Sequence, residues 1–444
     1  MKTTIAIAAI STVLCGAGNA GAQNAPAPPS VITLVDALQR AKQLEPTFLA
    51  AVAEAEIAKE DRVQAKAGML PAFSYSLQYI GNRGDTANPT GRFVSMDGVN
   101  MYRSWLQARQ ELSPGTLMGT PLVKARAVEA AAQAKLEIAQ RGLVVTVTRL
   151  YYAFVSAQRK YATAQLAAQQ AQRFYDIARQ QEQLGQVARS DVVKAEISYR
   201  QQEQAFAEAT LAMNTARMSL AVLIFPAFNE NFSIVDDMQS GPVLPPFAEV
   251  RALAEKGNPD LRAASETLNA AGADVRLAKN GLLPSLTLDA VYGIEANEFA
   301  LHSVYVATPE LGVLPNLGYA VTVNLTVPIW DWGGLRSKVH QSEARQRQAQ
   351  ASLTLAQRQL VSNLNSMYNE ALTARNAVDS LRHVAELATE SLRLVTLRYQ
   401  AGESTALEMA DAQNTAVSAR NAADDAEARY RVAIAELQTV TGSF

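Results

Sequence analysis

The sequence has little of what enzymes and metalloproteins use for chemistry. Its 444 residues include one cysteine, Cys15, and three scattered histidines, His302, His340 and His383. No Ser-His-Asp, metal-ligand or phosphate-loop constellation appears, so we expect no catalytic residue, no metal and no cofactor. The formal net charge is −2, which leaves no basic footprint for nucleic acid.

Long apolar runs are also missing. Residues 5–14 form a short apolar run, about half of the ~20 residues that a spanning helix needs. Lys2 precedes this run and Ala20-Gly21-Ala22 follows it, so we expect residues 1–22 to be a secretory signal peptide. Cys15 is a candidate lipidation site, but Leu14 stands before it where processing usually prefers a small residue, which favours ordinary cleavage.

What the sequence has in abundance is a heptad repeat. Small or apolar residues recur at alternating steps of four and three between positions 360 and 399, and again 217 residues earlier, where only Glu182 breaks the pattern. The later set is Leu360, Leu364, Met367, Ala371, Ala374, Val378, Leu381, Ala385, Ala388, Leu392, Val395 and Tyr399. The earlier set is Leu143, Val147, Leu150, Phe154, Ala157, Tyr161, Ala164, Ala168, Ala171, Tyr175 and Ala178. Such seams predict long helices packed on partner helices, and their recurrence predicts an internal duplication.

The duplication divides the chain. We expect an extended leader over 23–32, a first repeat over 33–224, a connector over 225–246 and a second repeat over 247–444. Thr33-x-x-Asp36 is a capping box that starts the first helix. Each repeat continues with a strand hairpin, a long helix and a return helix: about 70–112, 121–184 and 188–224 in the first, and about 283–329, 334–401 and 405–441 in the second.

The hairpins show the period of strands. Phe73, Tyr75, Leu77 and Tyr79 alternate with polar residues, and residues 317–327 alternate in the same way. Matching residues of the two halves lie 213 positions apart before the hairpin loops and 217 after them. The four extra residues therefore fall in the second loop, at about 293–316, because loops accept insertions.

Four such strands cannot close a barrel, since about eight are needed to surround even a filled interior. Strands of ~10 residues with one apolar and one polar face are typical of outer-membrane proteins, and lipid tolerates no open sheet edge. We therefore expect other copies of the chain to complete the sheet. The alternatives are a soluble hairpin packed on helices and a periplasmic coiled coil, which would not need the strands.

Several short motifs occur in order along the two halves: Lys66-x-Gly68-x-Leu70-Pro71, Lys279-x-Gly281-x-Leu283-Pro284, Pro328-Ile-Trp-Asp-Trp-Gly-Gly-Leu-Arg336, and helical tips at Gly185 and Gly402. In their order and duplication the chain resembles the TolC family of outer-membrane channel proteins over nearly all of its length. The first hairpin departs from the family pattern, with Ser113-Pro114-Gly115 in place of Trp-Asp-x-Gly-Gly.

The resemblance implies a mainly α fold with β: a homotrimer whose twelve-stranded β-barrel lies in the outer membrane and continues as a long periplasmic α-helical barrel with a mixed equatorial region. It also implies a passive exit duct. The partners would be a periplasmic adaptor protein that docks at Gly185 and Gly402, an inner-membrane pump of the RND or ABC type, and outer-membrane lipids.

Two acids in the second tip are candidate gate residues. Glu408 and Asp411 are three residues apart and share a helix face, so three copies would gather six carboxylates whose repulsion cations could relieve. This resembles the paired acidic rings of the family. Thr405-x-x-Glu408 is equally a capping box, which would explain Glu408 but not Asp411.

By resemblance, Asp191 in the first tip would bond Tyr399 of a neighbouring helix and hold the tip closed. Ser404 stands where the family usually has a basic partner, and Arg398 or Arg189 could substitute.

Three functions compete: the exit duct of an efflux or type I secretion system, a stand-alone porin, and a structural periplasmic coiled coil. A porin would need no long helices, which favours the duct. The exported cargo stays open between drug, metal, siderophore and protein.

Overall fold

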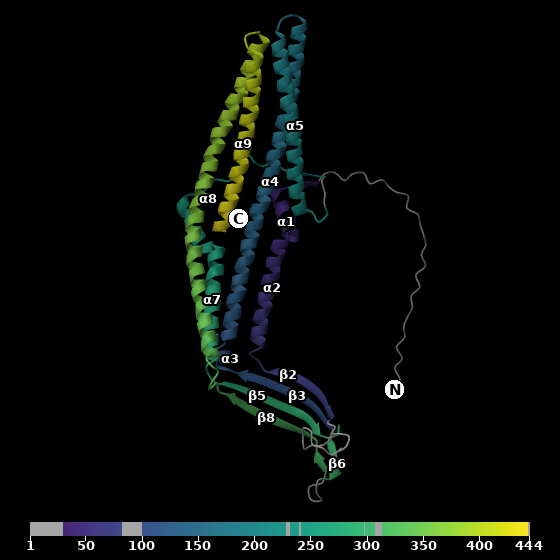
Figure 1. Cartoon of the computed structure of the whole chain (residues 1–444), viewed down its shortest axis with the longest axis vertical. Helices are drawn as coiled ribbons and strands as arrows, with labels where there is room; N and C mark the ends of the chain where they lie inside the picture. The colour runs from purple at the N-terminus through teal and green to yellow at the C-terminus, as the bar shows by residue number, and fades with distance from the viewer. Residues whose placement is uncertain are drawn as a thin grey trace, which may run out of the picture.

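The structure is a computed structural model that describes residues 30–81, 100–227, 231–238, 241–296, 298–306 and 313–442. The molecule is a long rod with a sheet at one end and two helical tips at the other (Figure 1). The predicted signal peptide with Cys15 lies outside the described residues, as do residues 23–29 of the leader.

Both halves of the chain contain the same succession of elements. The first half comprises α1 (Leu34–Leu44), α2 (Pro46–Ala67), β2 (Ala72–Gly81), β3 (Asn100–Leu112), α4 (Thr120–Gln183) and α5 (Arg189–Ile224). The second comprises α6 (Phe247–Gly257), α7 (Pro259–Asn280), β5 (Ser285–Ala296), β8 (Leu317–Thr326), α8 (Gly334–Gln400) and α9 (Ala406–Thr441). This succession confirms the predicted fold class, mainly α with β and internally duplicated.

The capping box predicted for the first helix is present. The Thr33 hydroxyl accepts from the Asp36 N–H at 3.2 Å, and the Asp36 carboxylate accepts from the Thr33 N–H at 3.2 Å. Two orphan donors of α1 are thereby satisfied, and the pKa of Asp36 lies below its ordinary value because the Thr33 side chain and backbone hydrogen-bond its carboxylate.

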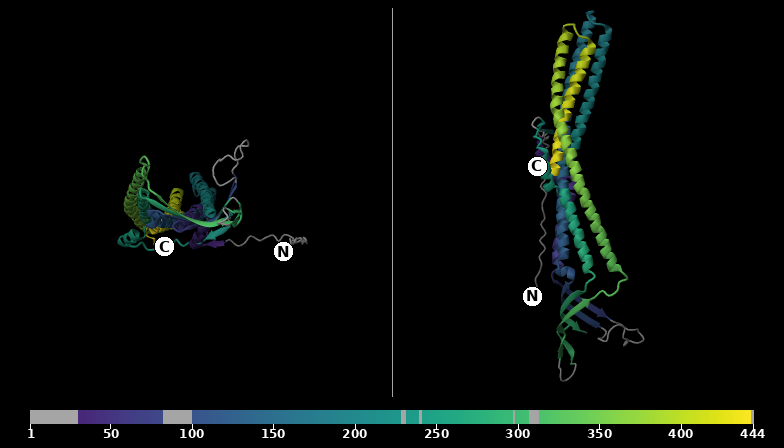
Figure 2. Two further views of the ribbon diagram at one scale, coloured as in Figure 1. Left: turned by 90° about the horizontal axis from the view of Figure 1, so that it is seen from below. Right: turned by 90° about the vertical axis from the view of Figure 1, so that its left-hand side faces the viewer.

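The long helices set the dimensions of the molecule. The 64 residues of α4 and the 67 of α8 span roughly 100 Å each at about 1.5 Å per residue. Near the sheet, α4 packs on α2 and α7; towards the tips it packs on α5 and α9. Viewed along the long axis, the helices form an open row rather than a closed bundle (Figure 2). Among the described residues, every helix is too polar or too short to span a bilayer.

The heptad seams are the contact faces of these helices. All of the predicted seam residues of α4 and α8 are buried or half-buried. Leu360, Leu364, Ala371 and Ala374 of α8 form one core with Tyr430, Ala433 and Leu437 of α9. Further towards the tip the seam consists of alanine, with Ala388 packed on Ala416 and Ala419.

One antiparallel sheet joins the two repeats, in the order β2-β3-β5-β8. The central pair, β3 and β5, comes from different halves, with Leu106 opposite Tyr292. The two hairpins have equivalent registers: Tyr79 lies opposite Tyr102 and Tyr292 lies opposite Tyr319. Within this sheet, β2 and β8 are the edges, and each has one unpaired side.

The register gathers apolar side chains on one face of the sheet. Phe73 and Tyr75 of β2 and Val321 and Val323 of β8 are exposed there, and Tyr319 is 82% exposed. The opposite face is polar: Arg103 pairs with Glu295 at 2.8 Å and Arg109 with Asp289 at 3.6 Å. The predicted division into an apolar and a polar face therefore holds across all four strands.

Three segments differ from expectation. The leader ends in strand β1 (Ser30–Ile32), which pairs in parallel with β4 (Phe232–Ile234) inside the connector, where no strand was predicted. The loop expected at 293–316 contains the last residues of β5 and a small hairpin of β6 (His302–Val306) and β7 (Val313–Pro315). Ser113 caps a short helix, α3 (Pro114–Leu117), at the departure from the family motif.

Candidate functional site at the helical tips

The two tips are built alike. Gly185 ends the α4 side of the first tip with φ +72°, and Gly402 ends the α8 side of the second with φ +78°. In the first tip the Gln186 N–H donates to the Gln181 carbonyl at 2.8 Å, and in the second the Glu403 N–H donates to the Arg398 carbonyl at 2.8 Å. A Cβ at either glycine would meet only open space, so the left-handed backbone is what favours glycine.

A small apolar cluster joins the two tips. Phe174 of α4 meets Tyr399 of α8 edge to face, with ring centroids 4.9 Å apart. Val192 of α5 and Met409 of α9 complete the cluster. The tips of one chain therefore pack together as a pair.

Tyr399 lies at the centre of this contact. Its hydroxyl donates to Gln181 Oε1 at 3.5 Å. Burial raises the pKa of Tyr399, and the nearby Asp191 carboxylate raises it further. The structure thus brings Asp191 and Tyr399 into one site, but within the chain it does not form the predicted bond between them: Asp191 contacts Lys194 at 3.7 Å.

Arg189 and Arg398, the basic residues considered as partners of Asp191, contact other groups. Arg189 contacts Glu182 at 3.4 Å. Arg398 donates to the Glu403 carbonyl at 3.2 Å. Both therefore stabilise their own tips, and neither reaches Asp191.

Glu408 and Asp411 are both exposed on the first turns of α9. Thr405 accepts from the Glu408 N–H at 3.2 Å, as an N-cap does. The Glu408 carboxylate accepts from the Ser404 hydroxyl at 2.6 Å. In a complete capping box it would accept from the backbone N–H of Thr405. The capping box is thus half formed, and the Asp411 carboxylate is one turn further along the exposed face.

A groove beside the tip was not predicted. It has a volume of about 630 Å³ and runs between α4 and α8, with Ile177 and Leu397 on its walls and Gln413 of α9 in its lining. Gln413 is buried, and neither its amide nitrogen nor its oxygen has a hydrogen-bond partner. In the sequence, alanines at 412, 416 and 419 recur at steps of four and three, and the position of Gln413 beside the first of them was the only signal.

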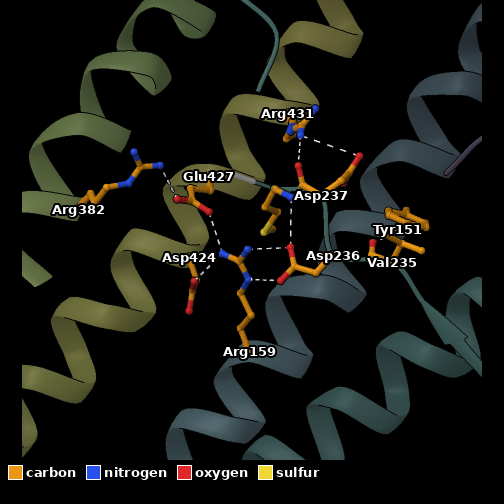
Figure 3. A network of polar contacts seen from close by, with 10 residues as sticks. Tyr151, Arg159, Val235, Asp236, Asp237, Arg382, Asp424, Glu427 and Arg431 are labelled. Carbon is orange, nitrogen blue, oxygen red and sulfur yellow. Dashed lines mark hydrogen bonds and ion pairs between the residues drawn. The ribbon is translucent and has the colours of Figure 1, made fainter. Parts of the chain in front are cut away.

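A polar network at the middle of the rod was also missed (Figure 3). Arg159 of α4 donates to both oxygens of Asp236 in the connector, at 2.6 and 2.7 Å. The same guanidinium donates to Asp424 at 3.0 Å and Glu427 at 2.8 Å, both on α9. Glu427 also accepts from Arg382 of α8 at 2.8 Å, so one network ties three long helices to the connector.

The protonation equilibria follow from these contacts. Burial alone would lower the pKa of Arg159, but hydrogen bonds to three carboxylates outweigh it and raise that pKa. Burial opposes ionisation of Asp236, yet hydrogen bonds from Arg159 and the Met238 N–H hold the pKa of Asp236 below its ordinary value. Burial raises the pKa of Asp424 despite its bond to Arg159. In the sequence, Arg159, Asp424 and Glu427 look like ordinary solvated helix surface and Asp236 like a loop acid, which explains why the network was missed.

Among the described residues, His, Cys, Asp and Glu side chains do not form groups of three or more that could hold a metal ion. The tips offer exposed carboxylates, a half-buried tyrosine and apolar contacts between helical hairpins.

Comparison with known proteins agrees with this architecture. The outer membrane efflux protein family model matches the chain twice, over residues 37–224 and 250–443. The outer membrane protein TolC of Vibrio cholerae is 24% identical over 423 residues, which cover 92% of this chain and 90% of that protein. The alkaline protease secretion protein AprF of Pseudomonas aeruginosa is 21% identical over 414 residues, 92% of this chain and 84% of its own.

Solved channels share the fold. The Campylobacter jejuni CmeC outer membrane channel superposes with a TM-score of 0.77 at 17% identity, over 97% of this chain and 94% of its own. The Neisseria gonorrhoeae MtrE outer membrane channel, in its open state, superposes with a TM-score of 0.75 at 23% identity. The match covers 92% of this chain and 88% of the MtrE chain. With both of its repeats matched by the family model, the chain belongs to the outer membrane efflux protein family and is a protein of the outer membrane.

Proposed function

We propose that this chain is one third of a passive outer-membrane exit duct for an efflux or type I secretion system. The observation that carries the proposal is the open four-stranded sheet with one apolar, exposed face. In lipid, the unpaired backbone groups of β2 and β8 would be left without partners, at a cost of several kcal/mol each. Three copies would supply twelve strands, enough to close a barrel with a lumen.

The helical row supports the same assembly. Its outermost helices towards the tips are α5 on one side and α8 on the other. Both carry exposed apolar residues, including Ile197 and Leu211 on α5 and Val361 and Leu387 on α8. Two different faces that need covering favour a head-to-tail ring, in which α5 of one copy packs on α8 of the next.

The family and the relatives support the transport role. Relatives are named for alkaline protease secretion and for pyoverdine export, so similar ducts carry unlike cargo. We infer that a periplasmic adaptor docks at the tips around Gly185 and Gly402 and that an inner-membrane pump supplies the energy. A wide lumen leaves the choice of cargo to the pump.

Complementation tests the duct. The chain is expressed in a strain that lacks its own exit duct, with and without a periplasmic adaptor, and export is measured. We expect export only with the adaptor. Passage of solutes without the adaptor would instead show a stand-alone porin, and absence from the membrane fraction would show a structural coiled-coil protein.

We propose that Glu408 and Asp411 form the periplasmic gate. Both carboxylates are exposed on one face of α9, where three copies would bring six together and bind divalent cations. In planar bilayers, Glu408→Ala with Asp411→Ala should abolish block by divalent cations. Glu403→Ala removes an acid from the same tip outside the pair and should leave block intact. Unchanged block in the double variant would leave Glu408 with its capping role alone.

Asp191 and Tyr399 are proposed to hold the tips together. The Asp191 carboxylate lies near the half-buried Tyr399, and the two belong to different hairpins. Asp191→Ala should therefore raise single-channel conductance in planar bilayers. A conductance equal to that of the wild type would exclude this latch.

A further inference from the structure

Three large apolar side chains protrude just after β8. Ile329 is 90% exposed, Trp330 76% and Trp332 89%. The two indoles meet edge to face, with centroids 5.6 Å apart. Burying one such ring stabilises a protein by about 2–3 kcal/mol, so a pair left fully in water indicates a surface that another phase or molecule covers.

The backbone holds these rings outward. Trp332 has φ +57°, the one positive φ among the described non-glycine residues. This conformation costs a bulky L-residue roughly 1–2 kcal/mol. Asp331 fixes it, because its carboxylate accepts from the N–H groups of Gly333 and Leu335 at the start of α8. The two indoles are thus displayed by a rigid turn.

The position of the turn matches the edge of a membrane. Two tyrosine pairs lie towards the other end of the apolar face, Tyr79 opposite Tyr102 and Tyr292 opposite Tyr319. Tyr102 lies opposite Ala296, so the two pairs are four residues apart along the strands. From Tyr319 to Thr326, β8 advances seven residues, about 23 Å at ~3.3 Å per residue, and the four residues from there to Trp330 add at most about 13 Å. With strands tilted by about 40–45° the whole stretch spans at most roughly 28 Å, enough to reach across the ~25 Å apolar band that aromatic girdles flank in outer-membrane proteins.

We propose that Trp330 and Trp332 bind the headgroup–acyl boundary of the inner, periplasmic leaflet and fix the depth of the sheet in the membrane. The indoles suit this boundary, since each has an apolar ring and one N–H donor. The surface continues the apolar face of β8, where Val323, Leu325 and Val327 are exposed. A neighbouring copy would pair with the edge of β8 through its backbone, which leaves this face uncovered. The assignment rests on the proposed insertion of the sheet into lipid.

The chain suits a fluorescence test, because its only tryptophans are Trp105, Trp330 and Trp332. Trp105 lies on the polar face, where Arg103 stacks at 5.1 Å from its ring centroid. Trp105→Phe therefore leaves only the two indoles of the turn. This full-length variant is reconstituted in phosphatidylcholine vesicles that carry bromine, a contact quencher, either near the headgroup or near the chain end. Shallow bromine should remove most of the emission and deep bromine little of it.

Two further variants make every outcome decisive. Trp330→Phe with Trp332→Phe leaves only Trp105, which neither lipid should quench. Val323→Trp in a background without the three native tryptophans places an indole in the middle of the apolar face, and deep bromine should quench it.

If Val323→Trp is quenched while Trp330 and Trp332 are not, a neighbouring copy or water surrounds the turn and this inference is wrong. Stronger quenching of Trp330 and Trp332 by deep bromine would also overturn it. If Val323→Trp is not quenched either, the sheet does not lie in lipid and the proposed duct itself fails.

Discussion

Arg159 offers the sharpest perturbation of the helical rod. Arg159→Met keeps most of the side-chain volume but removes the guanidinium that serves Asp236, Asp424 and Glu427. Asp424 is only 12% exposed in its side chain and would lose the cation it bonds, whereas Glu427, 11% exposed, would keep its pair with Arg382 alone. Removing one partner of a buried ion pair costs about 3–5 kcal/mol, and we expect about 3 per chain because Asp236 is 43% exposed.

The assay is chemical unfolding of the detergent-solubilised protein followed by helical circular dichroism. Arg159→Lys keeps the charge but cannot serve three carboxylates at once, so its stability should lie between wild type and Arg159→Met. Arg200→Met is the matched control, because Arg200 forms an exposed pair with Glu203 on α5 and lies over the ring of the adjacent Tyr199, so its loss should cost well under 1 kcal/mol. Equal unfolding midpoints for Arg159→Met and Arg200→Met would refute the reasoning.

The loss of stability in Arg159→Met should itself depend on pH. Asp236 has a pKa held below its ordinary value of 3.8, so its pairing contributes stability above that pH and loses it as the pH falls through the depressed pKa. Burial raises the pKa of Asp424, so this carboxyl is protonated at a higher pH than Asp236 as the solution is acidified. Once neutral, it no longer depends on Arg159 for a counter-charge. The difference in stability between wild type and Arg159→Met should therefore narrow as the pH falls below about 4. A difference that widens on acidification would contradict this.

Three other sites give separate predictions. Arg141→Met should cost about 2–3 kcal/mol in chemical unfolding, because the buried guanidinium binds last-turn carbonyls of both α6 and α9. Gly293→Ala should reduce the yield of folded oligomer on native gels, since its Cβ would lie 1.9 Å from the Ser104 carbonyl oxygen, whereas Gly318→Ala in open space should not. Tyr151→Phe should cost about 1–2 kcal/mol, because it loses the hydroxyl bonds to the carbonyls of Ile32 in β1 and Val235 in the connector; an unchanged unfolding midpoint would contradict this.

The parts of the fold that follow from periodic patterns could be predicted from the sequence. The heptad seams gave the long helices to within about a residue, and the alternation at Phe73 and Tyr75 gave the two-faced strands. The offset of 213 residues before the hairpin loops and 217 after them located the insertion between the strands of the second hairpin, and α2 and α7 before it and α5 and α9 after it are equal in length.

Structure that depends on single contacts could not be predicted. Strand β1 is three residues long, too short for any alternation to appear. Arg159 and Asp236 are 77 residues apart, and only the path of the connector brings them together. Trp105 breaks the polar alternation of β3, and its place on the polar face follows from its stacking with Arg103. At the tip, the exposed acids were identified from spacing, but the bond of Tyr399 to Gln181 depends on how the two hairpins pack.

The number of copies in the purified particle tests the central claim most directly. The protein is solubilised from membranes in mild detergent, and its protein mass is measured by light scattering with the detergent contribution subtracted. We predict three copies, because three sets of four strands close the sheet and cover both sides of the helical row. A folded monomer that keeps its helical circular dichroism and its sheet would contradict the account.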